Sequence, residues 1–315
     1  MKISVLDAGT LGADLDLSPL DSCGSVTVWQ TTSPDERIAH IGDAEVAVLN
    51  KVKLDRSVLT AVPSLRLICV AATGYDNIDL ACCRERGIAL CNVAGYSSRS
   101  VSQVTIAMAL SLLTHLPEYS RYTNDGSYSA SNVANKVSPA YHEICGMTWG
   151  VVGLGGIGRR VADIAQVMGC RVLVCRRTPD DTYPCVDMDT LCRESDIISL
   201  HVPLNDSTRG MLSRERIAQM KDGAILINVA RGAVTDEAAV AEAVLSGKLG
   251  GFGCDVYAAE PFPKEHPFYA LRGLDQVCLL PHMAWASVEA RRLCLDEIVR
   301  NIHAFARGER RSRVD

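Results

Sequence analysis

Short apolar runs alternate with amphipathic stretches from the N-terminus of the chain onward. Stretches with helical periodicity, such as DRSVLTAVP and NIDLACCRERG, separate the later runs. The runs are rich in Val, Ile and Leu and have the length of buried strands: KISVLD, SVTVWQ, AEVAVLN, LRLICVAA and GIALCN. Strands that alternate with helices predict a parallel sheet that is covered on both faces.

Strand and helix patterns alternate a second time in the C-terminal half of the chain. Helical patterns are predicted over residues 157–168 and 236–246, and an amphipathic helix over 287–307 closes the chain. The predicted strands are MTWGVVG, CRVLVC, DIISLHV, GAILINV, GGFGCDV and QVCLL. Two such series predict an α/β protein with two Rossmann-like, doubly wound parallel-sheet domains and a cleft between them.

The segment that joins the two series has a different pattern. Residues 100–116 are apolar nearly all round, which predicts a buried helix that bridges domains or lies in a subunit interface. Residues 117–146 are rich in Ser, Asn, Tyr and Pro and predict a loop-rich connection. We therefore expect one domain over 1–98 plus 284–315 and a second domain over 99–283.

Composition and charge narrow the class of protein. Of the 315 residues, 48% are hydrophobic and 22% charged, and the net charge is -5, which gives no general attraction for nucleic acid or for an anionic membrane. The N-terminus has neither a basic leader nor a long apolar core, and it is not typical of a signal peptide. The 13 cysteines contain no C-x-x-C pair, so we expect buried thiols in a reducing cytoplasm and no metal site.

The sequence VVGLGGIGRR contains the spacing of a dinucleotide-binding turn between a predicted strand and a predicted helix. Gly153 permits the tight turn, Gly155 lets the backbone approach a pyrophosphate, and Gly158 lets the helix pack on the strand. The amides of Gly156 and Ile157 would face the phosphates at the positive end of the helix. The alternative is a plain turn in a domain that binds no nucleotide.

The end of the next strand, VLVCRRTPD, indicates which nicotinamide cofactor is preferred. An NAD site usually has an acid about twenty residues after the glycines, where it binds the ribose hydroxyls. Cys175, Arg176 and Arg177 stand at this place, and the first acid is Asp180. Guanidinium groups bind a 2'-phosphate, so the sequence predicts NADP rather than NAD. Alternatively, the arginines are solvated, or one stacks on the adenine that both cofactors share.

The chain resembles the D-isomer-specific 2-hydroxyacid dehydrogenases, and within them most closely the glycerate dehydrogenase (hydroxypyruvate reductase) branch. The segments that carry the resemblance appear in the family's order: NKVKLD, AATGYDNIDL, VVGLGGIGRR, GAILINVARGAVTDEAAVAEAVLSGKLGGFGCDVYAAEP and LLPHMAWAS. The long run that ends in AAEP is far more specific than the glycine turn alone.

The resemblance implies three catalytic residues. Arg231 in NVARG would bind the substrate carboxylate and polarise the keto oxygen. His282 in PHMAW would exchange a proton with that oxygen, and Glu260 in AAEP would orient His282. A developing alkoxide needs both an acid and a cation, so the three residue types suit the reduction of a ketone.

The resemblance also implies residues that bind substrate and cofactor. Asn50, Lys51, Thr73 and Gly74 would join Arg231 around the substrate. Besides the glycine turn and the residues at the end of the next strand, the expected cofactor contacts are Val101, His201, Pro203, Thr208, Ala230, Asp255 and Ala284. His40, His115, His142, His266 and His303 lie outside the matched motifs, and we expect none of them to be catalytic.

The resulting hypothesis is an NAD(P)H-dependent oxidoreductase that reduces hydroxypyruvate or glyoxylate to D-glycerate or glycolate. Residues 1–98 plus 284–315 would form its substrate domain, and residues 99–283 its dinucleotide-binding domain. One alternative is a family member that acts on another D-2-hydroxy acid. The other is a non-catalytic, NAD(H)-sensing protein that resembles a corepressor. The apolar helix and the family's habit of pairing through it predict a homodimer, and no nucleic acid or membrane partner is expected.

Overall fold

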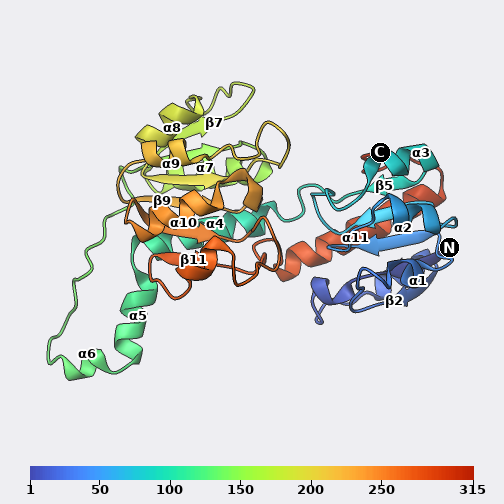
Figure 1. Ribbon diagram of the computed structural model, residues 1–315, viewed down its shortest axis with the longest axis horizontal. Coiled ribbons are helices and arrows are strands. Elements are labelled where there is room, and N and C mark those ends of the chain that lie inside the picture. Colours follow the sequence, from blue (N-terminus) through green and yellow to red (C-terminus); the bar gives the residue numbers. More distant parts are fainter. The chain divides into compact units, whose positions relative to one another are not determined.

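The computed structural model describes residues 1–315 and divides them into two compact units. Unit 1 comprises residues 1–97 and 286–315, and unit 2 comprises residues 98–285. Each unit has its own parallel sheet with helices on both faces (Figure 1). This architecture confirms the predicted fold class of two doubly wound α/β units.

The sheet of unit 1 has five parallel strands in the order β2-β1-β3-β4-β5. The two central strands β3 and β4 are buried along their whole length, as expected for strands that helices cover on both faces. The strands of this unit are β1 (Lys2–Val5), β2 (Ser25–Val28), β3 (Val46–Leu49), β4 (Leu67–Val70) and β5 (Ala89–Cys91).

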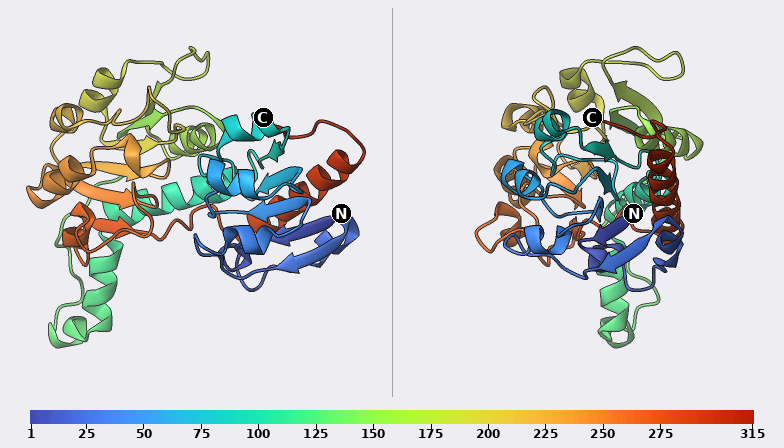
Figure 2. Two further views of the ribbon diagram at one scale, coloured as in Figure 1. Left: turned by 45° about the vertical axis from the view of Figure 1, so that its right-hand side comes forward. Right: turned by 90° about the vertical axis from the view of Figure 1, so that its right-hand side faces the viewer.

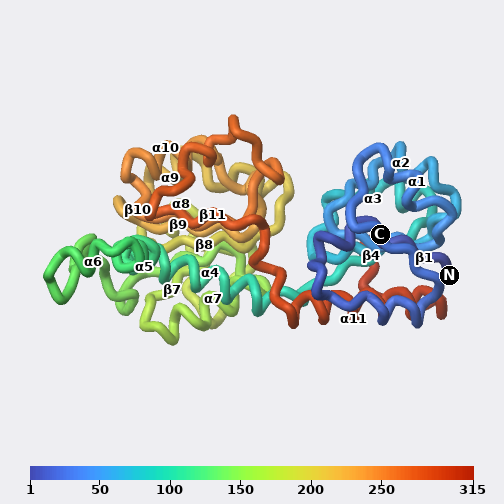
Figure 3. The backbone as a smooth tube through the Cα atoms, turned by 90° about the horizontal axis from the view of Figure 1, so that it is seen from below, coloured from blue at the N-terminus to red at the C-terminus, as the bar shows by residue number.

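Helices α1, α2 and α3 cover one face of this sheet, and α11 covers the other (Figure 3). Side-chain oxygens cap three of these helices: Asp55 begins α2, Asp79 begins α3 and Ser287 begins α11. The helical elements of unit 1 are η1 (Ala8–Leu11), η2 (Ser18–Cys23), α1 (Arg37–Ile41), α2 (Arg56–Ala61), α3 (Leu80–Arg86) and α11 (Val288–Ala306).

The sheet of unit 2 has six parallel strands in the order β11-β10-β9-β8-β6-β7. The chain begins at β6, adds β7 on one side, and then adds β8 to β11 on the other, so the order reverses between β6 and β8. These strands are β6 (Thr148–Val152), β7 (Arg171–Cys175), β8 (Ile197–Leu200), β9 (Ala224–Asn228), β10 (Leu249–Cys254) and β11 (Val277–Leu279).

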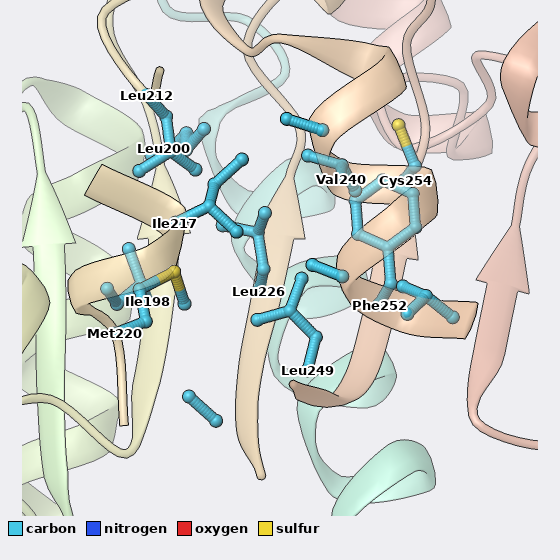
Figure 4. Packing of buried hydrophobic residues seen from close by; sticks show 14 of the residues in the cluster. Ile198, Leu200, Leu212, Ile217, Met220, Leu226, Val240, Leu249, Phe252 and Cys254 are labelled. Atoms are coloured by element: carbon cyan, nitrogen blue, oxygen red, sulfur yellow. The ribbon is translucent and has the colours of Figure 1, made fainter. Parts of the chain in front are cut away.

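Two apolar clusters hold helices to the two faces of this sheet. On one face Leu226 of β9 and Phe252 of β10 pack with residues of α9 and α10, among them Ile217 and Val240 (Figure 4). Helices α4 and α7 pack on the other face. The helical elements of unit 2 are α4 (Ser98–Leu113), α5 (Leu116–Asn124), α6 (Ser127–Ala130), α7 (Gly156–Val167), α8 (Met188–Glu194), α9 (Arg214–Gln219), η3 (Gly232–Val234), α10 (Glu237–Leu245) and η4 (Pro267–Leu271).

The connection after α4 differs from the prediction in part. Helix α4 ends at Leu113, three residues before the end of the predicted helix, and α5 begins at Leu116 after a left-handed residue, His115. Pro117 lies in the first turn of α5, where a backbone N–H would have no acceptor within the helix, so proline is tolerated there. The loop prediction is therefore wrong for residues 117–124 and 127–130, where α5 and α6 form an arm that extends from the sheet of unit 2 (Figure 2).

The apolar side chains of α4 are largely buried within unit 2. An added Cβ at Gly253 of β10 would lie 3.0 Å from Met108 Sδ, and one at Gly251 would lie 3.3 Å from Leu112 Cβ. The two glycines thus let α4 pack closely on the sheet. None of the helices combines the length and the apolar character that crossing a bilayer requires.

Candidate active site

The carboxyl edge of the sheet in unit 2 collects residues from every strand. Because all six strands run parallel, the residues that follow them lie along one edge. Gly153 follows β6, and Cys175 ends β7. Along the same edge His201 follows β8, Arg231 follows β9, Asp255 follows β10 and His282 follows β11. Most of the predicted cofactor and catalytic residues thus share one edge.

The glycine turn after β6 leaves a place for a phosphate. Gly153 has a φ of +91°, and a Cβ at Gly158 would lie only 1.9 Å from Gly153 O, so a side chain at either position would strain this turn. An added Cβ at Gly155, the residue that precedes α7, would meet no atom within 4 Å. Gly156 and Ile157 begin α7, and their amides have no acceptor within the helix. The turn therefore fits a dinucleotide.

Two arginines converge on one carboxylate near the end of β7. Asp180 accepts hydrogen bonds from Arg159, in the first turn of α7, and from Arg176 Nη1 at 3.0 Å. Desolvation opposes ionisation of Asp180, but the hydrogen bonds of Thr182 N–H and Arg159 lower its pKa below the usual value. Arg177 is exposed. Sequence reasoning missed Arg159, although it directly follows the last glycine of GIGRR.

His201, which follows β8, is partly buried. Trp149 Nε1–H donates to Ser199 Oγ at 2.9 Å, and that hydroxyl also hydrogen-bonds His201 Nε2 at 2.9 Å. Burial lowers the pKa of His201 to about 3, so the ring is neutral at physiological pH. His201 Nδ1 is buried without a hydrogen-bond partner, and a polar group of a bound molecule could satisfy it.

Three other predicted cofactor contacts have structural partners. Thr208 Oγ1 donates to Pro203 O at 2.6 Å and accepts from Asn205 N at 2.9 Å, which closes the turn after β8. Ala284 O accepts from Ser100 Oγ at 2.6 Å, and Val101 lies buried one residue further along α4. The first two hydrogen bonds thus close the turn after β8, and the third ties the segment after β11 to α4.

Asn228, the last residue of β9, fixes the backbone that carries Arg231. Its Oδ1 accepts from Ala230 N at 3.0 Å, and its Nδ2 donates to Arg231 O at 3.0 Å. Arg231 Nη1 donates to Ala230 O at 2.8 Å. Sequence reasoning did not single out Asn228, although a polar residue at the end of a buried strand is a usable signal.

Asp255 holds the segment after β11 in place. Its carboxylate accepts from Met283 N at 2.7 Å and from Ala284 N at 2.9 Å. Burial raises the pKa of Asp255, and these two backbone donors oppose that rise. Immediately before them, His282 has a left-handed φ of +55°, a conformation that a residue with a side chain keeps only when its surroundings fix it.

Glu260 and His282 form a direct pair. Glu260 Oε2 lies 2.6 Å from His282 Nδ1, and Glu260 Oε1 accepts from Tyr257 N at 3.0 Å. A carboxylate accepts hydrogen bonds, so His282 Nδ1 carries a proton and Nε2 is the nitrogen left for chemistry. The Glu260 and His282 side chains are 29% and 22% exposed, so both are partly open to solvent.

In unit 1 the predicted substrate residues follow β3 and β4. Asp7, just after β1, accepts from Asn50 N at 2.8 Å and from Lys51 N at 2.6 Å. Thr73 Oγ1 donates to Val93 O at 3.0 Å, and Gly74 is the next residue of that loop. Sequence reasoning missed Asp7, which fixes the loop after β3.

The family follows from comparison with known proteins. Residues 106–284 match the family model described as D-isomer specific 2-hydroxyacid dehydrogenase, NAD binding domain. The chain belongs to this family. Membership confirms the resemblance that the sequence motifs predicted, and it makes the protein a nicotinamide-dependent oxidoreductase of D-2-hydroxy acids.

Similar proteins cover nearly the whole of this D-2-hydroxyacid dehydrogenase chain. Glycerate dehydrogenase of Methylorubrum extorquens is 35% identical and covers 90% of this chain and 90% of its own. Hydroxypyruvate reductase of Blautia hydrogenotrophica is 34% identical and covers 98% of each chain. The crystal structure of D-lactate dehydrogenase from Aquifex aeolicus with NAD and lactic acid has a TM-score of 0.86 and 29% identity, covering 98% and 96% of the two chains.

Proposed function

We propose that this dehydrogenase reduces hydroxypyruvate or glyoxylate to D-glycerate or glycolate with a reduced nicotinamide cofactor. The observation that carries the proposal is the Glu260–His282 pair, which lies on the same sheet edge as Arg231. The names of the two curated relatives support this choice of substrate. A family member that acts on another D-2-hydroxy acid is the alternative.

His282 carries the proton in the proposed mechanism. With Nδ1–H bound to Glu260, the protonated ring presents Nε2–H to the keto oxygen and gives up that proton as the alcohol forms. Glu260 keeps the ring in one orientation and stabilises the imidazolium form. In the oxidative direction neutral Nε2 takes the proton back.

Arg231 supplies the cation. Its guanidinium binds the substrate carboxylate and stabilises the charge that develops on the keto oxygen. The hydrogen bonds of Asn228 to the Ala230–Arg231 backbone fix the point from which this side chain extends. Asn50, Lys51, Thr73 and Gly74 stay a prediction for the remaining substrate contacts.

Unit 2 is proposed as the dinucleotide-binding domain and unit 1 as the substrate domain. When bound, the cofactor supplies or accepts the hydride. The amides of Gly156 and Ile157 bind its pyrophosphate, and the unpartnered Nδ1 of His201 offers one further polar contact. Cofactor contact stays a prediction for Pro203, Thr208, Ala230, Asp255 and Ala284. The hydrogen bonds described above hold the backbone at these positions in place.

The test of this function is turnover by the purified protein. Cofactor absorbance is followed with hydroxypyruvate, glyoxylate, pyruvate and 3-phosphohydroxypyruvate, each with NADPH and with NADH. We expect the highest kcat/KM for hydroxypyruvate or glyoxylate. A higher kcat/KM for pyruvate would support the alternative substrate, and no turnover in the whole panel would refute the enzymatic proposal.

NADPH is the proposed preferred cofactor. Cys175 is neutral where an NAD enzyme usually has an acid, and the group Arg159, Arg176, Arg177 and Asp180 has an excess of positive charge. Asp180 already engages two of the arginines, so a 2'-phosphate would share them with this carboxylate. Arg177 is exposed and contributes attraction that salt screens.

Replacing Arg176 or Arg177 by alanine should lower the ratio of kcat/KM for NADPH to that for NADH by about tenfold. One charge-assisted hydrogen bond to the 2'-phosphate is worth about 1.5–3 kcal/mol, and exposure places the effect at the low end. Arg171→Ala is the matched control, because this exposed arginine lies at the opposite end of the same strand. A wild type that prefers NADH, or an unchanged ratio in both variants, contradicts the assignment.

The protein is proposed to be a homodimer. Segment 116–145 exposes Leu116, Val133, Val137 and Tyr141, each with more than half of its surface accessible, and these apolar side chains favour burial against a second copy. Light scattering at micromolar concentration should give twice the chain mass. Val137→Glu, at the most exposed of these positions, should shift the mass toward the monomer, whereas Val167→Glu on α7 serves as control. A monomeric wild type rules out this proposal.

A cytoplasmic location is proposed from the use of cysteine. Nine of the 13 cysteines are buried free thiols, and some of them lie in the apolar clusters of both units, the role of small hydrophobic residues in a reducing compartment.

A further inference from the structure

Unit 2 contains a second glutamate–histidine pair beside the first. Glu237, the first residue of α10, lies with its Oε2 2.9 Å from His266 Nε2. The two side chains are 11% and 6% exposed, so this pair is more deeply buried than Glu260–His282. His266 lies outside the motifs that predicted the catalytic residues, and the two partners are 29 residues apart.

The hydrogen bonds of His266 fix its tautomer. Its Nδ1 accepts from Phe268 N at 3.2 Å and therefore carries no proton. Its Nε2 accordingly carries the proton and donates it to Glu237. This arrangement is the reverse of His282, whose Nδ1 is the donor. With both ring nitrogens hydrogen-bonded, His266 links Glu237 at the start of α10 to Phe268 in η4.

The same glutamate also holds the loop that carries Glu260. Glu237 Oε1 accepts from Ala258 N at 2.9 Å, and Glu260 Oε1 accepts from the preceding amide, Tyr257 N, at 3.0 Å. Behind this stretch an added Cβ at Gly232 would lie 2.1 Å from Ala258 N, so η3 packs directly against it. The backbone of Tyr257 and Ala258 is therefore contacted by Glu237, by Glu260 and by η3.

Aromatic rings extend this contact to the strand that precedes His282. The Tyr257 ring packs against Phe262 with centroids 4.7 Å apart, and Phe262 packs against His266 at 5.1 Å. The Tyr257 hydroxyl donates to Leu280 O at 2.8 Å, two residues before His282. The buried pair therefore contacts both segments that carry the proton-transfer residues.

We propose that Glu237 and His266 are positioning residues that hold Glu260 against His282 through the Tyr257–Ala258 backbone. The inference rests on the proposed role of Glu260–His282 in proton transfer. Glu260 contacts His282 through Oε2, and its other oxygen, Oε1, accepts a hydrogen bond from Tyr257 N–H. Loss of the Glu237 carboxylate frees that backbone, and the short bond to His282 loosens even though no group that touches substrate has changed.

The first test replaces Glu237 by glutamine. Glutamine has a single acceptor oxygen, so it can accept from Ala258 N–H or from His266 Nε2–H but not from both, and its NH₂ group repels the other donor. We expect kcat for keto-acid reduction to fall roughly tenfold, the scale of one supporting hydrogen bond, while KM for the cofactor stays within about twofold. Glu242→Gln, in the same helix and paired with Arg214 at the surface, is the matched control.

A double-mutant cycle separates positioning from general destabilisation. If Glu237 acts through Glu260, Glu237→Gln has no further effect on kcat in a Glu260→Gln background. Independent, multiplicative losses would overturn the inference.

Two variants of His266 keep the test open should Glu237→Gln fail to fold. His266→Gln places an amide donor near the Nε2 position and retains the contact with Glu237. His266→Asn places an acceptor near the Nδ1 position, so it keeps the cap on Phe268 and loses Glu237. We expect His266→Gln to retain most of kcat and His266→Asn to lose as much as Glu237→Gln. Equal losses in both would contradict the assignment.

NMR of the imidazole ¹⁵N nuclei reports the tautomer of each histidine and does not depend on catalytic turnover. In the wild type the His282 ring should show one tautomer, with the proton on Nδ1, and in Glu237→Gln a mixture of both tautomers. If the wild type reduces no keto acid but the NMR response appears, the proposed function fails and the positioning role stands. An unchanged His282 signal in folded Glu237→Gln refutes the positioning role whatever the substrate is.

Discussion

Replacing His282 by alanine is expected to lower kcat for keto-acid reduction by roughly two to four orders of magnitude, the range of a lost general acid. The variant retains the Glu260 carboxylate but lacks the imidazole that would present a proton from that position. Water that replaces the ring would be held less firmly and would be a weaker acid.

Cofactor binding should survive this substitution, because the glycine turn and the end of β7 lie at other strands of the sheet. Quenching of tryptophan fluorescence by the reduced cofactor measures its Kd directly. His142→Ala, at an exposed position outside the predicted site, is the control for a lost histidine. A folded His282→Ala protein that turns over at the wild-type rate would falsify the assignment.

Arg231→Ala is expected to lower kcat/KM for the keto acid by about two to three orders of magnitude, the range for removal of one group that stabilises a developing oxyanion. Two effects combine, because loss of the carboxylate contact raises KM and loss of polarisation at the keto oxygen lowers kcat. Lysine at this position should restore only part of the activity, since its point charge lacks the planar fork of the guanidinium.

Steady-state kinetics over a wide range of keto-acid concentration separates the two effects. Arg214→Ala, which removes an exposed arginine paired with Glu242, should match the wild type. A rise in KM alone would limit Arg231 to substrate binding, and full activity of Arg231→Lys would show that geometry at this position is unimportant.

The arrangement of the site was predictable where chain order and strand polarity decide it. The residues after GAILINV, GGFGCDV and QVCLL had to lie along one edge once those segments were recognised as parallel strands, and this brought Arg231, Glu260 and His282 to the same side of the sheet. The glycine turn was predictable for a similar reason, since a strand and a helix flank it and its conformation requires glycine.

Contacts between distant loops were not predictable in this way. The partners in the pairs Glu237–His266 and Arg159–Asp180 are 29 and 21 residues apart in the sequence. No periodicity predicts how the chain between them folds back to bring them together. The two helices α5 and α6 were missed because Ser, Asn and Pro favour turns, whereas Pro117 is tolerated in the first turn of a helix.

Strands β9, β10 and β11 are immediate neighbours in the sheet, and each contributes one of the three ionisable residues. Adjacent parallel strands lie about 4.8 Å apart, so the sheet sets the spacing of the strand ends from which the segments with Arg231, Glu260 and His282 extend. Insertions or grafted peptides in the turn between α10 and β10, at the opposite edge of the sheet, should therefore leave the spacing of these residues intact. To transplant this activity onto another scaffold, an engineer would need three consecutive strand ends as a unit.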